Sequence, residues 1–196
     1  MPFAGKEIVM KQKITDIEGR LTLLPIHRAE SVDRFSNEYE EYSIFLKEEA
    51  RCYERLSISR THLLVDTHRN SILAYMSLVA DSVQLTGSEK GLVELGGIPF
   101  STFPALKIGK LAFDIEAKMA YIGIGSMMIK LARGFAAMMN DDGIACRFLT
   151  IDADIENNPN VTLFYTKNGF VPNERINNKN RLTISMRKDI FIDETG

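Results

Sequence analysis

The pattern of apolar and polar positions predicts a chain that mixes strands and helices. Runs rich in β-branched residues predict strands, and apolar residues spaced three and four apart predict helices. The expected strands are Leu21–Ile26, Thr61–Asp66, Ile72–Ala80, Ala105–Asp114, Cys146–Asp152 and Arg181–Arg187, and the expected helices are Ser36–Leu56, Gly125–Asn140 and Asn158–Asn168. Because strands and helices alternate in the C-terminal half, the order indicates an α/β (α+β) fold.

The connections between these elements differ in regularity. Residues 67–71, Thr-His-Arg-Asn-Ser, lie between two β-rich runs and predict a hairpin turn. Residues 81–104 contain four glycines and two prolines, so we expect a functional or flexible loop there. Residues 6–20 are compatible with either a short helix or an extended arm.

Length and composition indicate one domain over residues 1–196, in which residues 1–20 could form an N-terminal extension. The net charge of −2 and pI near 6.0 disfavour a general nucleic-acid binder. No apolar run approaches the ~18 residues of a membrane span, and the N-terminus lacks a signal-peptide core. Cys52 and Cys146 stand far apart, without metal-ligand spacing, so we expect a cytoplasmic protein that binds no metal.

The first segment with chemical meaning is a glycine turn that follows a strand. The strand Leu111-Ala112-Phe113 precedes residues 121–126, Tyr-Ile-Gly-Ile-Gly-Ser, and a long apolar helix. Glycines at such a turn let backbone N–H groups approach a diphosphate at the positive end of the helix. A tight packing turn is the alternative interpretation. A dinucleotide fingerprint would need a third glycine where Met128 stands, and the lysine of a P-loop is absent.

The second segment, residues 158–170, predicts a short helix that carries a tyrosine. Asn158 suits the helix N-cap, Pro159 suits the first turn, and Gly169 suits the left-handed position after the helix. Tyr165 shares one helix face with Val161, Phe164 and Asn168, so it faces the sheet. A buried core tyrosine with a satisfied hydroxyl is the alternative.

Together the two segments resemble the GNAT superfamily of acyl-CoA N-acyltransferases over residues 104–170. The phosphate loop of that family, Gln/Arg-x-x-Gly-x-Gly/Ala, aligns with residues 120–125. Its later motif, Asn-x-x-Ala-x-x-Phe-Tyr followed by Gly-Phe, matches Asn158, Phe164, Tyr165, Gly169 and Phe170, with Val161 in the alanine position. One departure is Ala120, which replaces the Gln or Arg; Lys118 could supply the missing charge.

The resemblance implies a fold, a cosubstrate and a reaction. The fold would be a mixed, mostly antiparallel sheet of about six to seven strands, splayed in the middle and flanked by helices. Acetyl-CoA would be the cosubstrate, without a metal, and a primary amine would attack its thioester directly. The residues implied in cofactor binding are Leu111, Ala112, Phe113, Ile122, Gly123, Ile124, Gly125, Ser126, Asn158, Phe164 and Tyr165. Tyr165 would also be the catalytic acid that protonates the CoA thiolate.

The acceptor and the base stay open at this stage. Asp81, Glu94 and Asp114 are candidate bases, and each could equally be a surface carboxylate. The expected acceptor is a small-molecule or protein amine, selected by residues 36–56 and 81–104. Residues 104–114, with Gly-Lys-Leu-Ala-Phe-Asp, also resemble the acetyltransferase toxins. That branch implies aminoacyl-tRNA as acceptor and a small DNA-binding antitoxin as partner, although the acidic pI counts against tRNA.

Two further expectations concern catalysis and assembly. A third hypothesis is a CoA-binding module that has lost catalysis, for which Ala120 is the main support. A homodimer could form through residues 177–187. Membrane association is not expected.

Overall fold

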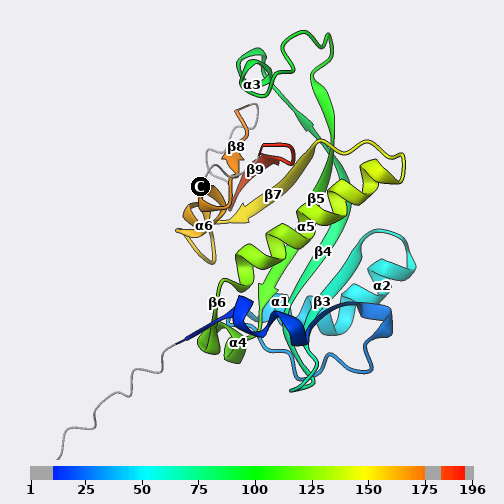
Figure 1. The fold of residues 1–196 in the computed structure, drawn as a ribbon, viewed down its shortest axis with the longest axis vertical. Coiled ribbons are helices and arrows are strands. Elements are labelled where there is room, and N and C mark those ends of the chain that lie inside the picture. Colours follow the sequence, from blue (N-terminus) through cyan, green and yellow to red (C-terminus); the bar gives the residue numbers. More distant parts are fainter. Residues whose placement is uncertain (1–10, 175–181, 193–196) are drawn as a thin grey trace, which may run out of the picture.

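A large twisted sheet lies at the centre of the computed structural model, which describes residues 11–174 and 182–192 (Figure 1). The order of its seven strands is β2-β3-β4-β5-β7-β9-β8. They are β2 (Leu21–Pro25), β3 (Arg60–Asp66), β4 (Ser71–Gln84), β5 (Thr102–Phe113), β7 (Phe148–Asp154), β8 (Val171–Pro172) and β9 (Thr183–Asp189). Among the described strands of this sheet, β5 and β7 are the one parallel pair, and the other neighbouring strands are antiparallel. The expected mixed, mostly antiparallel sheet is confirmed.

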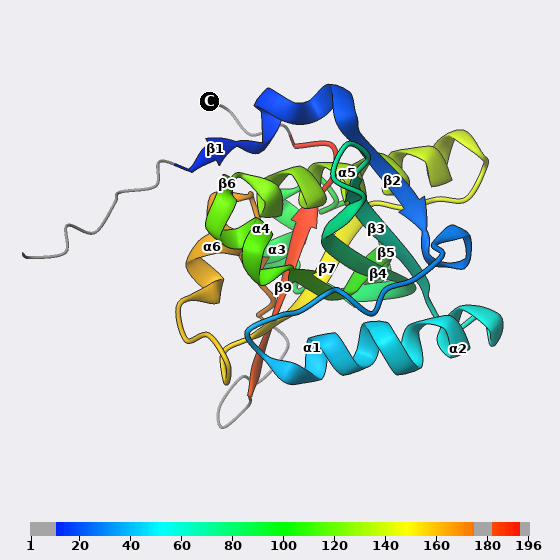
Figure 2. The same cartoon turned by 90° about the horizontal axis from the view of Figure 1, so that it is seen from below.

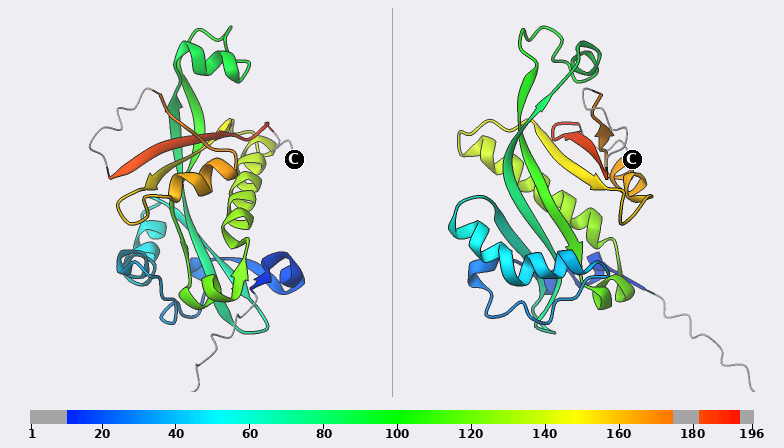
Figure 3. Two further views of the ribbon diagram at one scale, coloured as in Figure 1. Left: turned by 90° about the vertical axis from the view of Figure 1, so that its left-hand side faces the viewer. Right: turned by 180° about the vertical axis from the view of Figure 1, so that it is seen from behind.

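Helices cover both faces of this sheet (Figures 2 and 3). One face carries α1 (Glu40–Ile44), a π-helical segment (Phe45–Glu49) and α2 (Ala50–Arg55), which follow one another without a break. The opposite face carries α5 (Ile124–Asp141) and α6 (Val161–Lys167). In α5 the buried residues Met128, Ala132 and Ala136 repeat every four positions, as expected for a helix that lies along a sheet.

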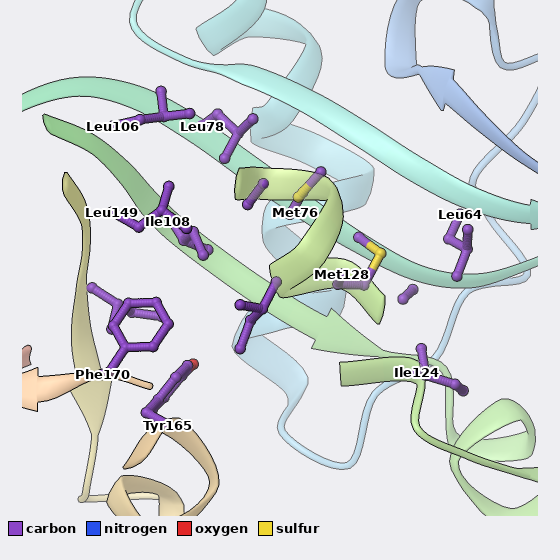
Figure 4. Packing of buried hydrophobic residues seen from close by; sticks show 14 of the residues in the cluster. Leu64, Met76, Leu78, Leu106, Ile108, Ile124, Met128, Leu149, Tyr165 and Phe170 are labelled. Carbon is purple, nitrogen blue, oxygen red and sulfur yellow. The ribbon is translucent and has the colours of Figure 1, made fainter. Parts of the chain in front are cut away.

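Each face has its own hydrophobic core. The larger core lies under α5 and α6 and includes Leu64, Met76, Ile108, Met128, Leu149, Tyr165 and Phe170 (Figure 4). The smaller core lies under α1 and α2 and includes Ile26, Phe35, Phe45, Leu46, Leu63, Tyr75 and Ala112. Neighbouring residues of a strand point to opposite faces, so Leu63 and Leu64 belong to different cores.

Most predicted elements are present with shifted ends. The β3–β4 hairpin is confirmed, with Asp66 paired to Ser71 across the turn. The helix expected from Ser36 begins at Glu40. The last strand is described from Thr183 onward, and Arg181 lies outside the described residues.

The expected loop over residues 81–104 is too long: residues 93–101 are irregular, but both ends of the range belong to strands and a helix lies within it. Strand β4 continues to Gln84, β5 already begins at Thr102, and α3 (Gly87–Leu92) lies between them at the tip of this long hairpin (Figure 1). A capping box explains α3, because the Thr86 hydroxyl accepts the Glu89 N–H while the Glu89 carboxylate accepts the Thr86 N–H.

Short elements surround the glycine turn and the N-terminal part of the described chain. They are β1 (Gln12–Lys13), two 3-10 helices (Ile14–Arg20 and Ile26–Arg28), α4 (Ile115–Ala120) and β6 (Tyr121–Ile122). Ile14 and Ile17 are buried in the larger core, and β1 pairs with β6 in parallel. Residues 14–20 therefore pack against the core as a short 3-10 helix.

Candidate active site

The central strands separate at the middle of the sheet. Residues 105–108 of β5 pair with residues 148–151 of β7. Beyond Ile108 and Ile151 the two strands are not paired with each other. A cavity of about 200 Å³ fills the gap. It is lined by residues 109–113 of β5, by Ile151, Asp152 and Asp154 of β7, by Asn157, Asn158, Val161, Phe164 and Tyr165 near α6, and by Asn37, Glu38, Tyr39, Tyr42 and Lys118.

Backbone groups of β5 face this cavity. The Asp114 N–H donates to the Leu73 carbonyl of β4 at 2.9 Å, whereas the Phe113 carbonyl accepts from the Asn37 side chain at 2.7 Å. Peptide groups of successive strand residues point to opposite sides, so the N–H groups of Phe113 and Leu111 point away from β4. The N–H of Ala112 points toward β4. Leu111 and Phe113 therefore present the donors available to a molecule in the cavity.

Tyr165 reaches the cavity from α6 with its ring in the larger core. Its ring lies 5.0 Å from that of Phe164 and 5.5 Å from that of Phe170, and only 6% of the residue is exposed (Figure 4). No described residue forms a hydrogen bond with its hydroxyl. Burial, and then the negative charge of Asp154, raise the pKa of Tyr165 well above its usual value, so it stays protonated at neutral pH.

The glycine turn forms the N-terminus of α5. Gly123 is the N-cap, with φ +89°, and the first intrahelical hydrogen bond joins the Met127 N–H to its carbonyl. The N–H groups of Ile124, Gly125 and Ser126 have no partner within the helix, which is what an anion site at a helix N-terminus requires. Residues 122–126 do not line the cavity itself.

Gly125 connects this turn to the cavity. A Cβ at this position would lie 2.6 Å from Cζ of Phe164 and 3.3 Å from Cζ of Phe113, and both phenylalanines line the cavity. The absence of a side chain at Gly125 thus lets the N-terminus of α5 lie directly against these two phenylalanines.

Ala120 ends α4, and its side chain packs partly buried against the larger core, so no charge replaces the expected Gln or Arg at that point. Lys118, two residues earlier, lines the cavity and pairs with Glu38 at 2.5 Å. A cation therefore lines the cavity, although it is already paired.

Asn158 lines the cavity but is not the N-cap of α6. The helix begins at Val161, with Asn160 as N-cap, and the Asn158 side chain accepts the Asn160 N–H at 3.1 Å. The predicted helix start was three residues early because Asn158 forms a turn within the loop rather than a cap.

The three carboxylates considered as bases lie outside the cavity lining. Asp81 accepts the Thr150 hydroxyl, and Asp114 is the N-cap of α4. Glu94 follows α3 at the far tip of the hairpin (Figure 1). The carboxylates that do line the cavity are Glu38, Asp152 and Asp154. None of residues 81–104 lines the cavity either.

Asp154 belongs to a polar group that the sequence did not indicate. Its carboxylate accepts the Tyr42 hydroxyl at 2.9 Å, the Asn157 side chain at 2.7 Å and the Asn157 N–H at 3.1 Å. Burial opposes ionisation, but these hydrogen bonds prevail and lower the pKa of Asp154. Tyr42 precedes Asp154 by 112 residues, so no local spacing could connect them.

Two observations concern other ligands and surroundings. Among the described residues, no group of three or more His, Cys, Asp or Glu side chains could hold a metal ion. Within the same residues, no helix combines the length and apolarity needed to cross a membrane.

No protein-family model and no curated protein matches the chain. Solved structures do match it over most of its length, and structures of AtaT and KacT are among them. The structure of AtaT complexed with acetyl-methionyl-tRNAfMet superimposes with a TM-score of 0.65 at 21% identity, covering 84% of this chain and 93% of AtaT.

Two further structures agree with this comparison. A tyrosine-to-phenylalanine mutant of KacT has a TM-score of 0.65 at 22% identity over 85% of this chain and 94% of KacT. AtaTR bound with AcCoA has a TM-score of 0.63 at 20% identity over 85% and 93%. At these identities the likeness is one of fold. The fold expected from the GNAT resemblance is therefore confirmed.

Proposed function

We propose that this protein is an N-acetyltransferase that moves the acetyl group of acetyl-CoA to a primary amine. The observation that carries the proposal is the gap between β5 and β7. It combines the backbone N–H groups of Leu111 and Phe113, which point away from β4, with the hydroxyl-bearing side chain of Tyr165. The pantetheine arm would pair with β5, and the diphosphate would bind at the N-terminus of α5.

The reaction would proceed in the following way. The amine nitrogen attacks the thioester carbonyl, and the oxyanion that forms accepts a hydrogen bond from the N–H of Leu111 or Phe113. The C–S bond then breaks, and the Tyr165 hydroxyl gives its proton to the departing thiolate. The proton released from the amine passes to water and returns to Tyr165. The products are the acetylated amine and CoA.

A thermal shift with acetyl-CoA, CoA, ATP and NAD in parallel tests the first step. A ligand at 100 times its Kd stabilises the folded state by about 2.7 kcal/mol, which is a rise of several degrees for a chain of this size. We expect this rise with acetyl-CoA and CoA alone. Absence of a shift with either CoA species at millimolar concentration would contradict the proposal. A shift without turnover on any amine would favour the non-catalytic module.

A second candidate is the toxin-type reaction on aminoacyl-tRNA. The fold of AtaT and KacT supports it, and so does Lys110, which lines the cavity and has no described carboxylate within ion-pair distance. A phosphate of the acceptor could meet this cation. Acetylation of methionyl-tRNA with radiolabelled acetyl-CoA, set beside spermidine and a peptide with a free N-terminus, distinguishes the acceptor classes. A short reading frame for a DNA-binding protein beside the gene would favour the toxin.

A further inference from the structure

A second tyrosine, Tyr42, also lines the cavity, and its hydroxyl proton is already used in a hydrogen bond. The Tyr42 hydroxyl donates to Oδ2 of Asp154 at 2.9 Å. A phenol has a single proton and two lone pairs. Toward a third group the Tyr42 oxygen can therefore only accept, whereas the Tyr165 hydroxyl, which has no described partner, is able to donate.

Asp154 is held in place as the acceptor of this proton. The backbone and side-chain amides of Asn157 both donate to its carboxylate. The same Asn157 side chain donates to Glu41 at 3.0 Å, and the Asn157 carbonyl accepts from the Tyr39 hydroxyl at 2.9 Å. A carboxylate with these donors stays ionised and cannot return a proton to Tyr42 at neutral pH.

The backbone and ring of Tyr42 are fixed as well. Its carbonyl accepts the hydroxyl of the buried Tyr75 at 2.8 Å, next to the π-helical segment. The ammonium of Lys110 lies 5.1 Å from the centre of its ring, a cation–π distance. The Tyr42 side chain is therefore positioned before any substrate arrives.

We propose that Tyr42 binds the acceptor amine, with Asp154 as its positioning residue. The Tyr42 oxygen accepts one N–H of the amine, so that the nitrogen lone pair is left to attack the thioester carbonyl. This inference rests on the proposed acetyltransferase function. It assigns the two tyrosines complementary tasks, because Tyr42 accepts a hydrogen bond from the nucleophile and Tyr165 donates a proton to the leaving group.

The first test compares Tyr42→Phe with Tyr53→Phe, a matched control on α2 whose side chain does not line the cavity. The assay uses radiolabelled acetyl-CoA with methionyl-tRNA, spermidine and a peptide with a free N-terminus. We expect Tyr42→Phe to lower kcat/KM for the amine about tenfold, as the loss of one hydrogen bond implies. The KM for acetyl-CoA should match that of Tyr53→Phe.

The second test is a double-mutant cycle with Asp154→Asn. The asparagine amide can donate to the Tyr42 oxygen and thereby occupy the lone pair that the amine needs. We expect a similar loss for Asp154→Asn alone, and no additional loss when it is combined with Tyr42→Phe. Losses that multiply in the double variant would overturn the positioning role of Asp154.

The outcomes separate this inference from the proposed function. If the wild-type protein acetylates one of the three amines and Tyr42→Phe is equally active, the Tyr42 assignment is wrong while the acetyltransferase function stands. If the wild type neither binds acetyl-CoA nor acetylates any of the amines, the proposed function fails, and the Tyr42 assignment fails with it.

Discussion

At the scale of the residue, Tyr165 both packs in the core and lines the cavity. Its ring contributes to the larger core through Phe164 and Phe170, and its side chain also lines the cavity. A core tyrosine and a catalytic tyrosine were alternatives in the sequence. In the structure the two are compatible, because the ring packs in the larger core while the residue also lines the cavity.

Replacing Tyr165 with phenylalanine removes only the proposed acid. We expect Tyr165→Phe to lower kcat by about 10²- to 10⁴-fold, the contribution typical of general acid catalysis. The Kd for acetyl-CoA, measured by calorimetry, should change little, because the ring and its contacts remain. An unchanged kcat would contradict the role of Tyr165 as the acid.

The raised pKa of Tyr165 also predicts how stability depends on pH. The unfolded tyrosine ionises near pH ~10, whereas the folded one keeps its proton to higher pH. The unfolded chain then binds fewer protons, so this contribution to stability is complete below pH ~10 and is lost as the pH rises above it. Urea unfolding at neutral and strongly alkaline pH should show a smaller alkaline loss for Tyr165→Phe than for the wild type. Equal losses would contradict the prediction.

The residues of the site differ in how far the sequence reveals them. Tyr165 was found because local spacing places it on the inner face of a short helix that ends at a glycine. Tyr42 and Asp154 meet only because α1 and β7 come together in the fold, at a separation of 112 residues. Lone carboxylates at strand ends cannot be ranked by sequence, and Asp114 proved to be a helix cap.

At the scale of the element, repeating burial explains the helices that the sequence predicted, and caps explain the helices that the prediction omitted. Long periodic segments such as α5 were predicted to within two residues at either end, because their burial repeats. Helices α3 and α4, of six residues each, are too short for a periodic pattern, and they form because Thr86 and Asp114 cap them. The capping box Thr86-x-x-Glu89 could have been recognised in the sequence.

Two glycines of α5 offer a matched test of the helix N-terminus. A Cβ at Gly125 would meet the Phe164 ring at 2.6 Å, whereas a Cβ at Gly134 has no atom within 4 Å. Gly125→Ala should therefore destabilise the protein by about 1–3 kcal/mol and weaken acetyl-CoA binding. Gly134→Ala should stabilise it by about 0.5–1 kcal/mol and leave binding unchanged. Urea unfolding and calorimetry with acetyl-CoA measure both effects, and equal behaviour of the two variants would refute the argument.

At the scale of the whole molecule, the candidate site and the tip of the β4–β5 hairpin lie in separate regions. The cavity lies where β5 separates from β7, next to α1 and α6, while the tip of the β4–β5 hairpin with α3 extends to the opposite end (Figure 1). That tip is attached to β9 by a buried ion pair, in which Nη1 of Arg187 lies 2.6 Å from Oε1 of Glu89. The same carboxylate oxygen accepts the Glu174 N–H, which joins the hairpin tip to the chain after β8.

Removing the cation of this pair should affect stability without affecting the cavity. Arg187→Met leaves the Glu89 carboxylate buried without its cation, which costs about 3–5 kcal/mol. Arg147→Met, which breaks the partly exposed pair with Asp189, should cost less. The Kd for acetyl-CoA should be unchanged in both variants, because neither arginine lines the cavity.

The pH dependence of the Arg187→Met deficit gives the sharper measurement. In the wild type, burial opposes ionisation of Glu89, but the hydrogen bonds from Glu174 and Thr86 and the charge of Arg187 lower its pKa. The stability from this pair is therefore present above the unfolded glutamate value of ~4.3 and is lost as the pH falls below it. Without Arg187, protonation relieves the buried charge, so the difference in unfolding free energy between wild type and variant should narrow on acidification. The unfolding free energies would be compared from pH 7 down to the lowest pH at which the wild type remains folded. If the difference between wild type and variant stays constant over this range, Arg187 stabilises the hairpin tip through packing and hydrogen bonding rather than through its charge.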